Sequence, residues 1–280
     1  MIDVLLAVYK PNPDWLRQQR ESILSQRDVE INLIEREDAS GEGVRANFAA
    51  LLAESRGEYV AFSDQDDIWA DDKLAKMLAK MRKLESKYGK NAPLLVFCDS
   101  EAVDEQLCPL GETTFIRTDV DPRRLAPRQL VLQNVASGHA MLFNAALRDK
   151  ALPIPPGAYM HDHWIGLVVS VFGHADYLNE PLVTYRQHKN NVIGAAKVNL
   201  WYFINRLRMG RKVLKDRLYA NIRQAEAFVE RYGDAAPECF KALVDLDKKA
   251  GLVRVWTLWR HRIFKHGILR NIGTWLLLVA

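Results

Sequence analysis

The sequence is poor in cysteine. Cys98, Cys108 and Cys239 are the three cysteines among 280 residues, and they show neither CxxC spacing nor the even number that disulfide pairing requires. Small secreted proteins are commonly stabilised by such pairs, so this pattern argues against a disulfide scaffold. We therefore expect a protein of a reducing compartment, the cytoplasm.

Apolar segments at the two ends of the sequence are short. Residues 1–8 (MIDVLLAV) have no basic leader and no cleavage site, so they predict a first strand rather than a signal peptide. The last apolar run, residues 275–279, is far below the roughly 20 residues that span a bilayer. Repeats and low-complexity segments are also absent, and a content of 49% hydrophobic and 26% charged residues is that of an ordinary globular protein.

Charge is divided unevenly along the chain. Residues 201–280 hold 16 Lys or Arg against 7 Asp or Glu, a net charge of +9, whereas residues 1–200 have a net charge of −5. A basic part of this kind favours a polyanionic partner, either nucleic acid or an anionic membrane surface.

Strand-length apolar runs alternate with helix-length segments in the first two thirds of the chain, and this rhythm predicts an α/β fold. Ligands of parallel α/β sheets bind beyond the carboxyl ends of the strands. The expected strands are residues 2–8, 29–34, 59–62, 94–97 and 140–143, with extended segments at 177–178 and 181–185. The expected helices are residues 14–26, capped by Asp14, and residues 46–55, 73–87 and 161–172, with long helices from about residue 201.

The segment SDQDDIW, residues 63–69, directly follows the expected strand 59–62. Carboxylates this close repel one another unless a cation or a hydrogen-bond donor compensates them. Hard oxygen ligands suit Mg²⁺ or Mn²⁺, which also bind substrate phosphates. An acidic helix N-terminus explains Asp71 and Asp72 well, but it leaves Asp64 and Asp66 unexplained, so we favour a metal–diphosphate site.

Five short motifs occur in a characteristic order: LLAVYK (5–10), EDAS (37–40), SDQDDIW (63–69), MHDHW (160–164) and YRQHKNN (185–191). Together they resemble the family-2 inverting glycosyltransferases, in particular the bacterial rhamnosyltransferase-like enzymes of surface polysaccharide assembly. The resemblance covers about residues 1–195. It implies the GT-A fold, a Rossmann-like and mostly parallel sheet with helices on both faces, as a catalytic domain over residues 1–196. Residues 197–280 would then form a basic, amphipathic helical extension.

The resemblance also implies roles in binding the donor nucleotide. Ala7 and Tyr9 would line the base pocket, and Glu37-Asp38 would accept a hydrogen bond from the base. Ala39 replaces the glycine that is usual there. The remaining nucleotide-binding residues would be Asn47, Asp64 and Gln65, with Asp66 as the metal ligand.

Inverting transfer needs a base that deprotonates the acceptor hydroxyl and an electrophile that stabilises the departing diphosphate. Asp162 stands in the position of the family's base, with His161 where many relatives have glutamate. Capping of the helix 161–172 is the structural alternative for Asp162.

Further residues follow from the same motifs. His188 would complete the metal shell or bond the diphosphate, and Arg186 and Lys189 would supply cations. Gly138, His139 and His161 would form the acceptor side. Trp69 and Trp164 would stack on sugar rings or, as an equal alternative, pack in the core.

Aromatic and basic residues alternate through residues 200–280, which suits helices at an anionic membrane surface. Packing against the catalytic domain and dimerisation are the alternatives.

The sequence thus predicts transfer of a sugar, with dTDP-rhamnose first and a UDP-hexose second, to a glycan or lipid-linked acceptor. The reaction would use Mn²⁺ or Mg²⁺ at the inner face of the cytoplasmic membrane, without nucleic acid. A sugar nucleotidyltransferase is one alternative, but YKPNP (9–13) lacks its glycine-rich phosphate loop. The other is a non-catalytic module that binds membrane or nucleic acid.

Overall fold

The computed structural model describes residues 1–279 except 40, 190, 192–196, 200, 201 and 203–209. One eight-stranded sheet forms its centre, with the order β2-β1-β3-β7-β5-β8-β4 and β6 paired to β5. The strands are β1 (Ile2–Val8), β2 (Ile31–Glu37), β3 (Tyr59–Ser63), β4 (Ile68–Trp69), β5 (Leu94–Val103), β6 (Pro109–Thr113), β7 (Met141–Asn144) and β8 (His174–Arg186).

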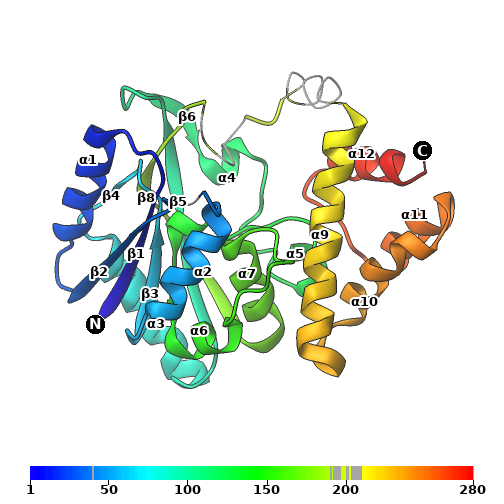
Figure 1. Cartoon of the computed structure of the whole chain (residues 1–280), viewed down its shortest axis with the longest axis horizontal. Helices are drawn as coiled ribbons and strands as arrows, with labels where there is room; N and C mark the ends of the chain where they lie inside the picture. Colours follow the sequence, from blue (N-terminus) through cyan, green and yellow to red (C-terminus); the bar gives the residue numbers. More distant parts are fainter. Residues whose placement is uncertain (40, 190, 192–196, 200–201, 203–209, 280) are drawn as a thin grey trace.

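Helices lie around this sheet and extend from it toward the C-terminus (Figure 1). Short 3-10 helices cover Gly138–Ala140, Gly233–Ala235 and Asp245–Lys248. The α-helices are α1 (Pro13–Leu24), α2 (Val44–Glu54), α3 (Lys73–Tyr88), α4 (Thr114–Arg117), α5 (Pro127–Leu130), α6 (Ala145–Ala151), α7 (His161–Phe172), α9 (Arg211–Tyr232), α10 (Glu238–Val244), α11 (Gly251–Arg260) and α12 (Ile268–Val279).

The expected α/β class is confirmed, but the sheet is mixed rather than mostly parallel. β1 pairs in parallel with β2 and β3, and β5 pairs in parallel with β8. β7 enters between β3 and β5 and runs antiparallel to both, and β4 and β6 are also antiparallel to their partners. β7 is reached from β5 through β6, α4 and α5 rather than through one crossover helix, and only a parallel neighbour requires such a crossover.

Successive hydrophobic side chains along a strand point to opposite faces of the sheet, and each face has its own core. In β1, Val4, Leu6 and Val8 join the core that α1 and α3 cover, whereas Leu5 joins the core that α2 and α7 cover. Successive strand side chains point to opposite faces, so a fully buried strand can serve both cores at once. The helices on both faces that were expected are therefore present.

Nonlocal pairing extends several elements beyond the expected limits. β5 continues to Val103, and the two extended segments expected near residue 180 are one strand, β8, paired along its length with β5. The cap of α1 is Asn12, not Asp14, because the Asn12 Oδ1 accepts hydrogen bonds from the backbone N–H groups of Asp14 and Trp15.

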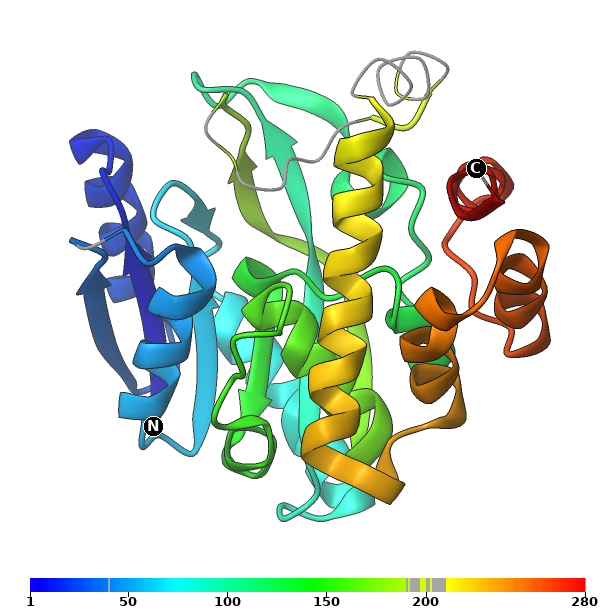
Figure 2. The same ribbon diagram turned by 45° about the vertical axis from the view of Figure 1, so that its right-hand side comes forward.

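The long helix α9 stands against α7, and the core of that face continues into the C-terminal helices (Figure 2). Trp164 of α7 is fully buried, with its ring centroid 5.6 Å from that of Phe228 on α9. Core packing, not a sugar contact, is thus the role that the structure shows for Trp164. Residue 196, the expected end of the catalytic domain, lies outside the described residues, and this division of the chain stays a prediction.

Among the described residues, no helix combines the length and the apolar character needed to cross a bilayer.

Phe228→Ala tests whether α9 is an integral part of the fold. The Phe228 side chain is fully buried between Trp164 and Phe240, so its loss leaves a cavity, and we expect the unfolding free energy to fall by about 3–5 kcal/mol. Guanidinium denaturation measures this change. The control Ile116→Ala, at a side chain 67% exposed, should change it by less than about 0.5 kcal/mol. A loss below about 1 kcal/mol for Phe228→Ala would show that α9 is only loosely attached.

Candidate active site

A cleft of about 2580 Å³ opens beyond the carboxyl ends of β1 and β3. Its walls come from the loops after these strands, from the start of α7 and from α9 and α12. Most of the residues expected at the site line it: Ala7, Tyr9, Asp38, Asn47, Asp64, Gln65, Asp66, Gly138, His139, His161, Asp162, His188 and Lys189. Glu37 is exposed outside this lining, so within the Glu37-Asp38 pair only Asp38 faces the cleft.

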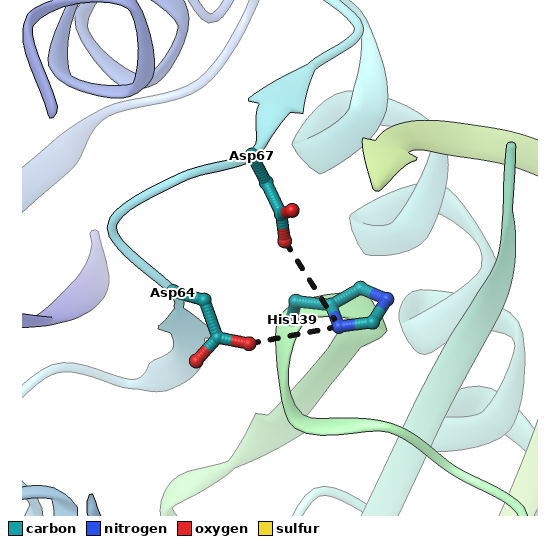
Figure 3. A group of neighbouring side chains, drawn as sticks. All are labelled: Asp64, Asp67 and His139. Atoms are coloured by element: carbon teal, nitrogen blue, oxygen red, sulfur yellow. Dashed lines mark ion pairs between the residues drawn. The ribbon is translucent and has the colours of Figure 1, made fainter. Parts of the chain in front are cut away.

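Asp64 and Asp67 converge on one histidine ring (Figure 3). The Nδ1 of His139 lies 3.7 Å from the Asp64 Oδ2 and 4.0 Å from the Asp67 Oδ2. His139 comes from the 3-10 helix before β7, and its buried ring stacks on Tyr185 with 4.4 Å between centroids. The sequence placed His139 on the acceptor side, whereas the structure places it among the carboxylates.

Asp66 faces a second histidine. Its Oδ2 lies 2.6 Å from the His188 Nε2, and the His188 ring packs beside Trp15. The expected proximity of Asp66 and His188 is therefore present, as a direct contact between the two side chains.

Crowding and burial set the protonation of the three aspartates. Burial, with the neighbouring carboxylates, raises the pKa of Asp66 and raises that of Asp67 well above its ordinary value. Burial opposes ionisation of Asp64 too, but the His139 hydrogen bond and charge outweigh it and lower the Asp64 pKa. The Asp67 Oδ2 is buried without a hydrogen-bond partner. A cation placed here would relieve this crowding.

Two buried basic side chains support the acidic loop from behind. The Arg186 guanidinium donates to the carbonyl oxygens of Asp66 and Glu105 and to the Gln18 Oε1, and only 2% of the residue is exposed. Arg186 does not line the cleft, so the expectation that it contacts the diphosphate is wrong: its donors are used to hold the loop.

The second support, Lys73, was not recognised in the sequence. It is fully buried and donates to the His139 carbonyl oxygen at 2.7 Å, with its Nζ 3.2 Å from the centre of the Trp69 ring. Burial lowers its pKa to about 7. The signal was its spacing, since Lys73 falls on the same helical stripe as the buried Met77 and Met81.

Trp69 itself is 3% exposed and lies beneath Lys73, away from the cleft lining. It is a core residue, and the expected stacking on a sugar ring is wrong for it as for Trp164.

The proposed nucleotide side is held rigidly. The Gln65 amide exchanges two hydrogen bonds with the Tyr9 backbone, accepting from its N–H at 2.7 Å and donating to its C=O at 3.0 Å. Asp38 accepts from the backbone N–H groups of residues 41–43, which fixes the loop before α2. Asn47 is buried and donates to the carbonyl oxygen of Arg36.

Asp162 lies in the first turn of α7, where the cap is Met160, so the capping alternative is wrong. Its carboxylate accepts from the backbone N–H of His163 at 2.6 Å and of Gly138 at 3.1 Å. A Cβ on Gly138 would come 2.9 Å from the His161 Nε2, and that ring is fixed by stacking on Phe48. Glycine at 138 thus allows the approach that orients Asp162.

Residues 12–88, which span α1 to α3 and include the acidic loop, match the model of glycosyl transferase family 2. This part of the chain is therefore similar to family-2 glycosyltransferases. Proteins of Mycobacterium tuberculosis and Mycobacterium bovis whose function is uncharacterised are 24% identical over 155 residues, 55% of this chain. The chain matches only 42% of their length.

Solved structures show the same fold. S. aureus TarS, residues 1–349 with UDP-GlcNAc, superposes with a TM-score of 0.54 at 14% identity, over 99% of this chain and 90% of that 1–349 chain. The Pyrobaculum calidifontis mannosyltransferase PcManGT, with GDP-Man and Mn²⁺, superposes with a TM-score of 0.51 at 16% identity. The match covers 93% of this chain and 72% of that chain. Both likenesses show that this chain shares their GT-A-like architecture.

The acidic loop and His139 offer a donor set that fits a divalent cation. Ligand atoms of Asp64, Asp67 and His139 lie within 4.8 Å of one another, and the unpartnered Asp67 Oδ2 is one of the oxygens in this group. Carboxylate oxygens with an imidazole nitrogen suit Mn²⁺, and carboxylates alone also suit Mg²⁺. Asp66 of the same loop and His188, which follows β8, are the pair expected from the sequence, and both line the same cleft.

Asp67→Asn tests the electrostatic strain of the metal-free site. The pKa of Asp67 is higher in the folded protein than in the unfolded chain. Protonated Asp67 therefore contributes its full stabilisation at a pH below the ordinary carboxyl pKa, and this contribution is lost as the pH rises through the raised pKa. At pH 8 we expect the metal-free variant to be more stable by about 1–2 kcal/mol, and near pH 4 no more stable. Denaturant titration measures both values.

Mn²⁺ should raise the stability of the wild type and have little effect on Asp67→Asn. The exposed Asp247→Asn serves as the control that leaves all these values unchanged. A variant that is less stable at pH 8 without metal would mean that the ionised Asp67 is fully compensated.

Proposed function

We propose that the chain transfers a sugar from a nucleoside diphosphate donor to an acceptor hydroxyl, with inversion and with a divalent cation. The observation that carries the proposal is the meeting of the acidic loop, its two histidines and Asp162 in one cleft. The cleft exceeds the roughly 300–1,000 Å³ of most small-molecule sites, so donor and acceptor can be held together.

The donor is proposed from the relatives as well as from the site. TarS was solved with UDP-GlcNAc and PcManGT with GDP-Man and Mn²⁺, which supports a nucleotide sugar and a metal for this chain. Ala7, Tyr9, Asp38, Asn47 and Gln65 would hold the nucleoside. dTDP-rhamnose remains our first candidate and a UDP-hexose our second.

Asp64, Asp66, Asp67, His139 and His188 would hold the cation next to the diphosphate, with Lys189 as a further cation on the cleft wall. Bound there, Mn²⁺ or Mg²⁺ would neutralise charge that develops on the leaving diphosphate. Lys73 and Arg186 act behind this set, because Lys73 holds the His139 backbone, Arg186 holds the acidic loop, and neither lines the cleft.

Asp162 would act as the base. Its two backbone hydrogen bonds fix the carboxylate and leave lone pairs toward the cleft. The acceptor oxygen would bond to the anomeric carbon, the bond from that carbon to the diphosphate oxygen would break, and the hydroxyl proton would pass to Asp162. We propose a glycan or lipid-linked acceptor of surface polysaccharide synthesis, on the cytoplasmic side of the membrane.

Asp162→Asn tests this assignment. An amide of the same shape cannot take the proton, so we expect kcat to fall by about 10²–10⁴-fold. Donor affinity should stay nearly unchanged, because Asp162 is assigned to the acceptor. Turnover of dTDP-rhamnose and UDP-hexoses measures the first effect, and NMR of the wild-type product should show the inverted anomeric configuration.

Asp149→Asn, on a side chain 66% exposed, is the matched control and should keep wild-type turnover. Near-normal turnover of Asp162→Asn, or a product of retained configuration, would refute the proposed mechanism.

A further inference from the structure

Helices α11 and α12 expose an unusually apolar surface. Of the 17 large hydrophobic side chains that are exposed among the described residues, nine lie in these two helices. We call them the C-terminal apolar face: Leu252, Val253, Trp256, Trp259, Ile268, Leu269, Ile272, Leu276 and Val279.

Spacing gathers these side chains into a stripe on each helix. In α11, Leu252, Trp256 and Trp259 recur at intervals of four and three residues and are 75%, 59% and 59% exposed. In α12, Ile268, Ile272 and Leu276 recur every four residues. A surface helix of a globular protein normally turns its apolar stripe to the core. Here the exposed stripes indicate a surface that an apolar partner, such as a membrane or another protein, covers.

The two helices are fixed to each other and to the rest of the chain (Figure 2). Trp259 of α11 lies against Phe264 and Trp275, with 5.7 Å and 6.3 Å between ring centroids. The segment between the helices is anchored where the His266 Nδ1 accepts a hydrogen bond from the Asp121 backbone N–H. The C-terminal apolar face is therefore presented in a defined orientation.

Charge indicates what covers this face. Residues 251–280 contain five Lys or Arg and no Asp or Glu, and Arg260 and Arg262 are exposed beside the apolar stripes. Apolar and aromatic residues edged by cations match the interface of an anionic bilayer. A second copy of the chain would bring the same cations against each other across a two-fold interface, which is unfavourable.

The face also continues into the cleft. Leu269, Ile272 and Leu276 belong to the C-terminal apolar face and line the cleft as well, on the wall opposite the acidic loop. A surface bound to this face would thus meet the open edge of the cleft. An acceptor anchored in that surface could enter along α12.

We propose that the C-terminal apolar face docks on an anionic lipid bilayer, so that the cleft wall formed by α12 faces the bilayer. Docking is inferred from the exposed residues of α11 and α12 alone, whereas the delivery of a lipid-anchored acceptor rests on the proposed function. The occupant is the bilayer surface itself, bound from one side and not crossed.

Flotation of the whole protein with vesicles tests the docking. We expect binding to vesicles that contain phosphatidylglycerol, much weaker binding to pure phosphatidylcholine, and loss of binding at high salt. Brominated lipids in the same vesicles should quench the fluorescence of Trp256 and Trp259, because both side chains would enter the interface.

Matched variants separate this face from the rest of the surface. The double variants Trp256→Ser with Ile272→Ser, and Arg260→Gln with Arg262→Gln, should each lower partition by roughly 10-fold or more. The controls Leu24→Ser and Ile116→Ser, at side chains 66% and 67% exposed, and Lys90→Gln, at a side chain 71% exposed, should leave it unchanged.

Wild-type protein that does not float with anionic vesicles would overturn the proposal, and so would equal flotation of the face variants and the controls. Binding of RNA or self-association in place of vesicle binding, if lost in the same variants, would reassign the face to that partner. Nucleotide binding is measured on the same samples. Failure of docking with intact nucleotide binding rejects this inference alone, and the reverse result rejects the proposed function alone.

Discussion

Three carboxylates within four residues, at the end of the buried strand β3, are the constraint around which the structure is organised. Asp64, Asp66 and Asp67 cannot all be ionised in a buried loop unless positive charge or hydrogen-bond donors face them. The chain supplies these from the nearby Lys73 at the start of α3 and from two distant segments, with His139 before β7 and with Arg186 and His188 at and after the end of β8. The mixed sheet is what brings these segments together, since β7 and β8 lie on the side of β3 away from β1.

The charged residues around the acidic loop fall into two groups with different roles. Lys73 and Arg186 are buried, use their donors on carbonyl oxygens, and hold the backbone of the loop and of His139. Asp64, Asp66 and the two histidines line the cleft, whereas Asp67 is buried outside this lining and its Oδ2 has no hydrogen-bond partner. This incomplete balance of charge is one that a bound cation would relieve. The Asp162 carboxylate accepts a hydrogen bond from the Gly138 backbone N–H, which orients it for the role of base proposed above.

Local sequence patterns predicted much of this architecture and only part of the site. The position of the acidic loop, the helix at residues 161–172 and the strand at residues 2–8 follow from apolar runs that neighbours along the chain determine. The direction of β7 and the length of β8 depend on pairing between segments far apart, which no local pattern encodes. For the same reason the sequence does not reveal that Arg186 is buried and donates to Asp66, Glu105 and Gln18 instead of lining the cleft. His139 was recognised, but its place between Asp64 and Asp67 depends on the pairing of β7 with β3.

The most direct test of the central claim is a calorimetric titration of the protein with UDP and with dTDP, each with and without Mn²⁺. The account predicts that one nucleotide binds tightly only when Mn²⁺ is present, and that Asp66→Asn removes this dependence on the metal. Binding that is equally tight without metal, or no binding of either nucleotide under any condition, would contradict the view that the acidic loop is a metal–diphosphate site.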